Sequence, residues 1–139
     1  MDHGQNSDVV KGQCLCGAVR FHTNKASLTD VAVCHCGMCR RWHGHVGAYT
    51  NAPRADLVFD ADAELAWFDS SGFARRGFCR RCGSSLFWDA PERGSISIAA
   101  GTLDARTGLT TTLQIFAGHR GDYYEIDTAV PVRPEPPPA

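Results

Sequence analysis

The sequence predicts a mainly β fold with little helix, and three observations support this prediction. Seven short segments are typical of strands, and the last two show clear alternation or a high content of β-branched residues. Glycines and prolines stand at most junctions between these segments. Helix signals are scarce. The predicted strands are residues 18–24, 30–34, 46–53, 65–70, 85–90, 95–101 and 110–118.

Two further segments complete the expected order of elements. Residues 36–44, CGMCRRWHG, have room for one helical turn, which would place Cys36 and Cys39 on one face. Residues 122–127, DYYEID, are expected to form a last short strand. Five aromatic residues are expected in the core: Trp42, Phe78, Phe87, Trp88 and Phe116.

Length and composition indicate one domain with a modest core. The chain has 139 residues, of which 43% are hydrophobic and 21% charged, as in an ordinary globular protein. We expect a flexible N-terminal tail over residues 1–8, one domain over 9–128 and a proline-rich tail over 129–139.

Charge and hydropathy argue against several classes of function. The formal net charge is -1, so no overall basic character indicates a nucleic-acid partner. No apolar run approaches the length needed to span a bilayer, and the polar N-terminus lacks the pattern of a secretory signal. We therefore expect a cytoplasmic protein without a nucleic-acid or membrane partner.

Seven cysteines are many for a chain of this length. A secreted disulfide protein would favour an even number, whereas clustered cysteines in a reducing cytosol are more often metal ligands. The cysteines fall into three groups along the chain: Cys14 with Cys16; Cys34 with Cys36 and Cys39 (the trio); and Cys79 with Cys82. We call the first and last groups together the quartet.

The quartet has the right number of ligands for a structural zinc site. Residues i and i+2 of an extended segment project to the same side, so Cys14 and Cys16 can face one ion. Cys79 and Cys82 form a C-x-x-C-G turn, in which Gly83 allows the backbone to curl around the sulfurs. A zinc ion held by these distant pairs would close a long loop.

The trio offers only three ligands, which predicts a reactive zinc site whose fourth position takes water or a substrate thiolate. A closed Cys₃His site is the alternative. His35 lies between two ligands and should point away from the metal in an extended segment, whereas His43 is close enough in sequence to reach it. A disulfide within the trio would be an oxidised state of the same site.

Positive charges stand beside both sets of cysteines. Metal-bound thiolates accumulate negative charge that nearby cations offset, and arginine suits capture of a ligand carboxylate. A solvated surface position is the alternative for any one arginine. Trp42, next to the trio, is a candidate pocket residue. The basic residues are Arg40, Arg41 and His43 after the trio, and Arg75, Arg76, Arg80 and Arg81 around Cys79 and Cys82.

The motifs GQCLCGAVRF, CHCGMCRRWHG, FCRRCGSSLFW and IFAGHRGDYYEI occur in this order over roughly residues 9–127. Together they resemble the glutathione-dependent formaldehyde-activating enzyme family, which implies an Mss4-like zinc-binding β-sheet fold over 9–128. The resemblance also implies two zinc ions per chain. The structural ion would be held by Cys14, Cys16, Cys79 and Cys82, and the catalytic ion by Cys34, Cys36 and Cys39.

The resemblance implies a carbon–sulfur lyase that forms S-hydroxymethylglutathione. Its substrates would be glutathione, or a similar small thiol, and formaldehyde, or another small aldehyde. Zinc would lower the pKa of the incoming thiol, and the positioned thiolate would add to the carbonyl. His43 is a candidate proton donor. The candidate ligand-binding residues are Arg40, Arg41 and Trp42.

Two other functions fit the same cysteines. One is a glutathione carrier or thiol sensor without catalysis, and the other is a zinc-stabilised protein-interaction module with a closed second site and an exposed apolar patch. The family's late segment often contains alanine, proline, tryptophan and tyrosine in succession. Tyr123 stands here where that tryptophan is expected, which bears on the choice of substrate.

Overall fold

A computed structural model describes residues 8–135 of the chain. The described residues form two compact units, one from residues 8–29 and 50–108 and the other from residues 30–49 and 109–135. Strand β4 (Gly47–Pro53) begins in the second unit and ends in the first. Each unit carries one of the two cysteine clusters, so each is described by itself.

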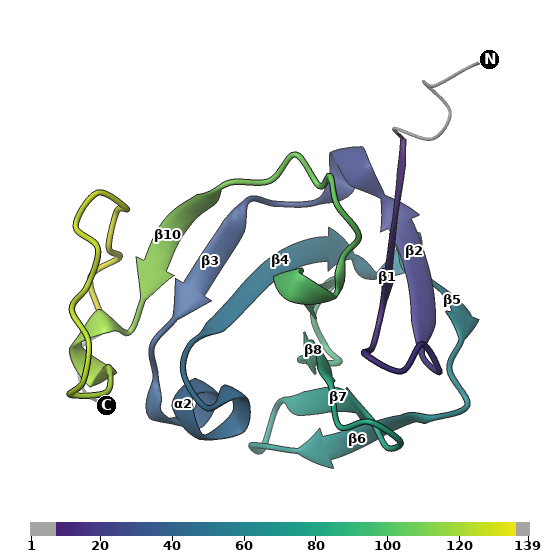
Figure 1. Cartoon of the computed structure of the whole chain (residues 1–139), viewed down its shortest axis with the longest axis horizontal. Helices are drawn as coiled ribbons and strands as arrows, with labels where there is room; N and C mark the ends of the chain where they lie inside the picture. Colours follow the sequence, from purple (N-terminus) through teal and green to yellow (C-terminus); the bar gives the residue numbers. More distant parts are fainter. Residues whose placement is uncertain (1–7, 136–139) are drawn as a thin grey trace. The chain divides into compact units, whose positions relative to one another are not determined.

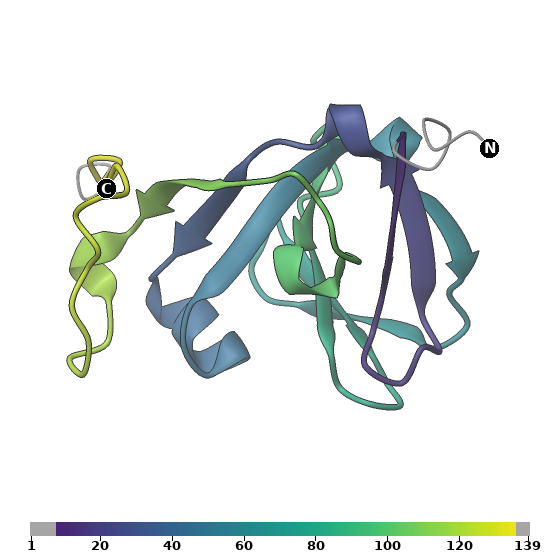
Figure 2. The same cartoon turned by 45° about the horizontal axis from the view of Figure 1, so that its top comes forward.

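The first unit combines a three-stranded sheet with an antiparallel meander (Figures 1 and 2). Phe21 and Phe87 pack with ring centroids 5.1 Å apart, and Phe59 meets Phe87 at 5.6 Å, so the sheet packs on the meander around these rings. The sheet has the order β1-β2-β5, formed by Val9–Gln13, Arg20–Asn24 and Val58–Ala61. The meander consists of β6 (Leu65–Asp69), β7 (Arg75–Cys79), β8 (Ser85–Asp89) and β9 (Ser95–Ala99).

Alternation along β9 shows why this segment is a strand. Ile96 and Ile98 are buried, whereas Ser95 is exposed, so the apolar side chains face the core and the short polar ones do not. Three short 3₁₀ turns also belong to the first unit: η1 (Lys25–Ser27) follows β2, η2 (Arg54–Asp56) lies between β4 and β5, and η3 (Ala100–Thr102) follows β9.

The second unit is built on three strands and one helix. β3 (Val31–Cys34) lies between β10 (Thr111–Ile115), which is parallel to it, and the first half of β4, which is antiparallel (Figure 1). Helix α2 (Gly37–His43) follows β3 directly, and 3₁₀ turn η4 (Ala117–His119) follows β10.

The expected mainly β fold with little helix is confirmed, because residues 8–135 form ten strands and one α-helix of seven residues. All seven predicted strands are present, with ends shifted by a few residues. The helix is longer than the single turn expected. Three strands of the described chain had not been predicted: β1, β5 and β7.

Two expectations are wrong. Residues 122–124 form a turn and a bend and residues 125–127 have no regular structure, while the hydroxyls of Tyr123 and Tyr124 bond to His45 and His35 of the same unit. Among the five expected core aromatics, Phe87 alone is buried. The others, Trp42, Phe78, Trp88 and Phe116, are half-buried. Phe21, which the sequence did not single out, shares the centre of the core with Phe87.

The division into a domain over 9–128 and two tails stays a prediction, and residues 1–7 and 136–139 lie outside the described residues. The segment after residue 129 nevertheless follows β10. Gln114 pairs in parallel with Val132, and the N–H of Arg133 donates to the Gln114 carbonyl at 2.9 Å. This contact holds residues 131–133 beside the end of β10.

Candidate metal centres

The quartet is assembled from two turns of the first unit. The four sulfurs of Cys14, Cys16, Cys79 and Cys82 lie within 4.8 Å of one another. Two Sγ–Sγ distances are 3.7 Å, between Cys14 and Cys16, and 3.8 Å, between Cys16 and Cys79. A tetrahedral zinc ion with Zn–S bonds of about 2.3 Å separates its sulfurs by about 3.8 Å. The quartet therefore fits a Cys₄ zinc ion, and none of the seven cysteines, all of which lie within the described residues, is paired in a disulfide.

Both turns use glycine in a conformation that other residues rarely adopt. Gly17 and Gly83 each have φ +81°, directly after the second cysteine of their pair. The N–H of Gly83 donates to the Cys79 carbonyl at 2.8 Å, which closes the C-x-x-C-G turn. The expectation that Gly83 lets the backbone curl around the sulfurs is confirmed.

The cysteines of the quartet differ in pKa because their surroundings differ. The Ser84 hydroxyl, 3.2 Å from the Cys82 sulfur, and the Ser84 backbone lower the pKa of Cys82 to about 5. The Ala18 N–H lowers the pKa of Cys16, but burial and the neighbouring thiols raise it to about 11. Without a cation, four sulfurs this close together cannot all be thiolates, because their negative charges repel one another. A bound cation would offset this repulsion.

The trio is formed where β3 passes into α2. Cys34 ends β3, Cys36 is the N-cap of α2, and Cys39 lies in the first helical turn. The Cys36 sulfur accepts the Cys39 N–H at 3.4 Å, in the manner of an N-cap oxygen. The three sulfurs lie within 4.8 Å of one another, and Cys34 and Cys39 are buried.

Gly47 on β4 leaves space for the trio. A Cβ at this position would lie 3.1 Å from the Cys39 sulfur and 3.0 Å from Cδ2 of His43. A side chain here would force both residues to move. Hydrogen bonds from the thiols of Cys34 and Cys39 lower the pKa of Cys36, and the same contact with Cys36 raises that of Cys34.

His35 points away from the trio sulfurs, as expected for a residue between two ligands of an extended segment. Its Nε2 lies 2.9 Å from Gln114 Oε1, and its Nδ1 contacts the Tyr124 hydroxyl. The Gln114 amide nitrogen donates to the carbonyls of Asp127 and Val130. Gln114 Oε1 is thus the acceptor, so His35 Nε2 carries the proton and Nδ1 accepts from Tyr124.

His43 lies close to the trio without joining it. Its Nε2 is 2.6 Å from the Tyr49 hydroxyl, and among the described residues neither histidine belongs to the group of three sulfurs. This arrangement favours the open site over the closed Cys₃His alternative. The role of His43 as a proton donor stays a prediction.

The candidate ligand-binding residues have different surroundings. The Nε atom of Arg40 is buried and has no hydrogen-bond partner among residues 8–135, although the side chain is half-buried as a whole. Arg41 is exposed and Trp42 is half-buried. Arg40 therefore has an unused donor on the helix that carries Cys39.

The arginines near Cys79 do not all form a basic rim around the quartet. Arg75 bonds to buried Asp89 at 3.0 Å, and Arg54 binds the other oxygen of Asp89 at 2.8 Å. Arg76 is buried within β7. Arg80 lies 3.8 Å from Glu64, and Arg81 is exposed. Two of the four arginines thus face the core and not a ligand.

His45 and Tyr124 were not selected from the sequence as site residues, and Tyr123 was noted only because it stands where the family's tryptophan is expected. The His45 Nδ1 lies 2.8 Å from the Tyr123 hydroxyl, and its ring meets that of Tyr124 at 4.7 Å. Burial raises the pKa of Tyr124, as does Tyr123, whereas Arg120 and Arg40 lower it. The sequence signal for these contacts was the pair of tyrosines in the DYYEI motif, but the prediction of a strand there drew attention away from their side chains.

The family of the chain follows from comparison with known sequences. Residues 9–119 match the model of the glutathione-dependent formaldehyde-activating enzyme family. The chain belongs to this family. The match covers every cysteine of this family member, so the predicted resemblance is confirmed.

Two curated relatives are similar over part of the chain. An uncharacterized lyase of Schizosaccharomyces pombe is 30% identical over 80 residues, 56% of this chain and 56% of the relative. A Halomonas elongata protein named "Putative glutathione-dependent formaldehyde-activating enzyme" is 34% identical over 88 residues, 57% of this chain and 55% of the relative. The chain thus spans little more than half the length of these relatives.

A solved structure supports the fold alone. The crystal structure of a Rhodobacter sphaeroides protein aligns with a TM-score of 0.55 and 21% identity, covering 88% of this chain and 99% of that chain. Within the described residues, no helix has the length and apolar character that crossing a membrane requires.

Proposed function

We propose that this family member is a zinc-dependent carbon–sulfur lyase that forms S-hydroxymethylglutathione from glutathione and formaldehyde. The observation that carries the proposal is the trio, which gathers three sulfurs within 4.8 Å and, among the described residues, includes no fourth donor. Family membership and the names of the relatives support the reaction. A structural zinc ion on the quartet is part of the proposal.

The residues of the trio would hold the second zinc ion: Cys34, Cys36 and Cys39. When bound, this ion lowers the pKa of the thiol that takes the fourth position. The buried Nε of Arg40 offers a donor for negative charge that develops near the trio. Trp42 and Arg41 are retained as candidate contacts for the rest of the ligand.

The reaction itself balances without a redox partner. The thiol sulfur adds to the carbonyl carbon, the C=O π electrons move to oxygen, and the thiol proton ends on that oxygen. His43 is proposed to move this proton, with Tyr49 holding its ring at 2.6 Å. Holding both reactants in place replaces a bimolecular encounter.

The rate of adduct formation tests this proposal, because formaldehyde also reacts with glutathione unaided. We expect the zinc-loaded protein to raise the rate above the spontaneous background in proportion to its concentration, and Cys36→Ser to abolish the increase. A rate equal to the background, with glutathione still bound, would instead identify a carrier or thiol sensor. If glutathione does not bind at all, the zinc-stabilised protein-interaction module is the function that fits.

A further inference from the structure

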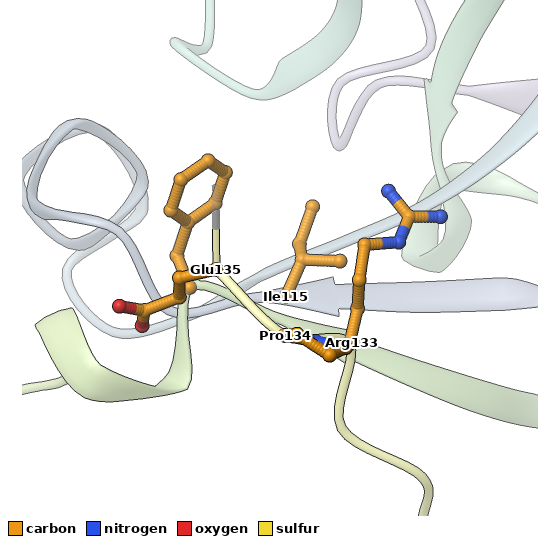
Figure 3. A pocket seen from close by; sticks show the side chains of 5 residues that line it. Ile115, Arg133, Pro134 and Glu135 are labelled. Carbon is orange, nitrogen blue, oxygen red and sulfur yellow. The ribbon is translucent and has the colours of Figure 1, made fainter. Parts of the chain in front are cut away.

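A groove of about 300 Å³ lies in the second unit, at the end of β10 (Figure 3). Ile115, Phe116 and Pro134 give it an apolar lining, whereas Arg133 and Glu135 contribute opposite charges. In Figure 3 the side chains of Ile115 and Arg133 extend toward the same side of the backbone. A volume of this size suits a small ligand.

Strand register connects this groove to the trio. β10 runs parallel to β3 with Ile115 opposite Cys34. On the other edge of β10, Gln114 is opposite Val132, so Arg133 comes next to Ile115. Paired residues point to the same face of a sheet, and successive residues alternate. Cys34, Ile115 and Arg133 therefore form one row across three neighbouring segments.

The position of Gln114 supports this assignment of faces. Its side chain bonds to His35, which points away from the trio. Ile115, the next residue on β10, consequently belongs to the face of Cys34. The apolar side chain of Ile115 thus lies between Cys34 of the trio and Arg133.

The length of this row matches a small peptide. Neighbouring strands lie about 4.8 Å apart, so the backbones of Cys34 and Arg133 are separated by about 10 Å. The thiol of glutathione belongs to the middle residue, so a terminal carboxylate lies about one to two residue lengths, or about 4–7 Å, along the peptide from it, and the long arginine side chain spans the remaining distance. A ligand whose sulfur lies at the trio can therefore cross Ile115 and bring a carboxylate to Arg133.

Arg133 is free to take such a carboxylate. Its side chain is exposed, and its guanidinium has no hydrogen-bond or ion-pair partner among residues 8–135. The nearby carboxylate of Glu135 is occupied, since it accepts the Gly118 N–H at 2.6 Å and lies 3.6 Å from His119. The guanidinium fork matches a carboxylate in geometry and charge.

The backbone at Phe116 gives independent support. Phe116 has φ +56°, in the left-handed region that bulky residues rarely adopt. Such conformations cluster at ligand clamps and active sites, where surrounding structure enforces them. Here the conformation occurs at a residue that lines the groove.

We propose that Arg133 binds the carboxylate of a small, peptide-like thiol whose sulfur lies at the trio. This inference rests on the proposed function and extends it, because it makes the protein selective for carboxylate-bearing thiols over neutral ones. Arg133 lies beyond residues 9–119, which match the family.

Thiol titrations of the cobalt-loaded protein, followed by its absorption spectrum, test this inference. The thiols are glutathione, glutathione diethyl ester and 2-mercaptoethanol. We expect Arg133→Gln to weaken glutathione binding by about tenfold to a hundredfold, as for loss of a charged hydrogen bond. Binding of 2-mercaptoethanol should stay within about twofold, and the diethyl ester should bind to the wild-type protein as weakly as glutathione binds to Arg133→Gln.

Arg106→Gln is the matched control, because it removes the same charge from an exposed position outside the groove. We expect it to leave all three affinities unchanged. The inference is overturned if Arg133→Gln binds glutathione as tightly as the wild type, or if it weakens all three thiols equally. If no thiol changes the cobalt spectrum of the wild-type protein, the proposed function fails first, and this inference fails with it.

Discussion

The two cysteine clusters differ in how the chain brings their sulfurs together. The quartet joins two turns whose cysteines Cys16 and Cys79 are 63 positions apart. The trio lies within six consecutive residues at the junction of β3 and α2. A cation on the quartet therefore restricts a long stretch of the unfolded chain, whereas a cation on the trio restricts very little. We infer that the quartet serves stability and the trio serves chemistry.

Loss of a quartet ligand should have the largest effect. In Cys79→Ser a fully buried sulfur is replaced, and the remaining three cannot complete a tetrahedral site. Because structural zinc contributes about 10 kcal/mol or more to folding, we expect cooperative unfolding of the first unit to disappear. Thermal unfolding followed by circular dichroism measures this. A transition like that of the wild type would contradict the stabilising role of the quartet.

Loss of a trio ligand should separate chemistry from stability. We expect Cys36→Ser to lower the zinc content by one ion per chain and to abolish glutathione binding. The melting temperature should fall by only a few degrees, because the trio closes no long loop. Elemental analysis, calorimetry with glutathione and thermal unfolding provide the three readouts. Unfolding as severe as in Cys79→Ser would contradict the division of roles between the clusters.

A smaller effect is expected at the turn that carries the quartet. Gly83→Ala places a Cβ at φ +81°, which should destabilise the fold by about 1–2 kcal/mol. Gly72→Ala is the control, because Gly72 does not have a positive φ and has open space around its Cα. Urea unfolding of both variants gives the difference. Equal stability of the two would show that the glycine conformation is not required.

The smallest effect concerns acid release of zinc. The Ser84 hydroxyl helps to lower the pKa of Cys82 to about 5, so this sulfur remains a thiolate as the pH falls. Ser84→Ala removes that donor and raises the pKa. As the pH falls, protons then compete with zinc for the Cys82 sulfur at a higher pH. The midpoint of zinc release from the quartet should therefore move to higher pH by about half a unit. A zinc-sensitive dye measures the midpoint, and an unchanged or lower value would contradict this account.

Much of the fold could be predicted because several strands carry a strong local signal. Segment 95–101 alternates isoleucine with serine, and β9 follows from that pattern alone. In contrast, β7 contains two arginines and Gly77, which give little strand propensity. Gly77 is needed there because a Cβ would approach the Trp67 ring to 2.9 Å. That requirement arises from the neighbouring strand and cannot be read from β7 itself.

In the candidate site, too, some features could be predicted from local sequence and others could not. Cysteine type and spacing sufficed to predict both clusters and the outward direction of His35, because period-two geometry operates within a few residues. Nothing local indicated that Gln114 and Tyr124 bind His35. These contacts bridge 79 and 89 positions. Arg75 shows the opposite error, since its position beside a cysteine motif predicted a rim, whereas buried Asp89 binds it.

By itself, the sequence determined which sulfurs can share an ion, because ligand number and short spacing are local properties of the chain. The tertiary structure alone decided which other groups reach the same place. The parallel register of β3, β10 and residues 131–133 puts Cys34, Ile115 and Arg133 in one row. Such a row depends on hydrogen bonds between distant segments, and no residue carries that information alone.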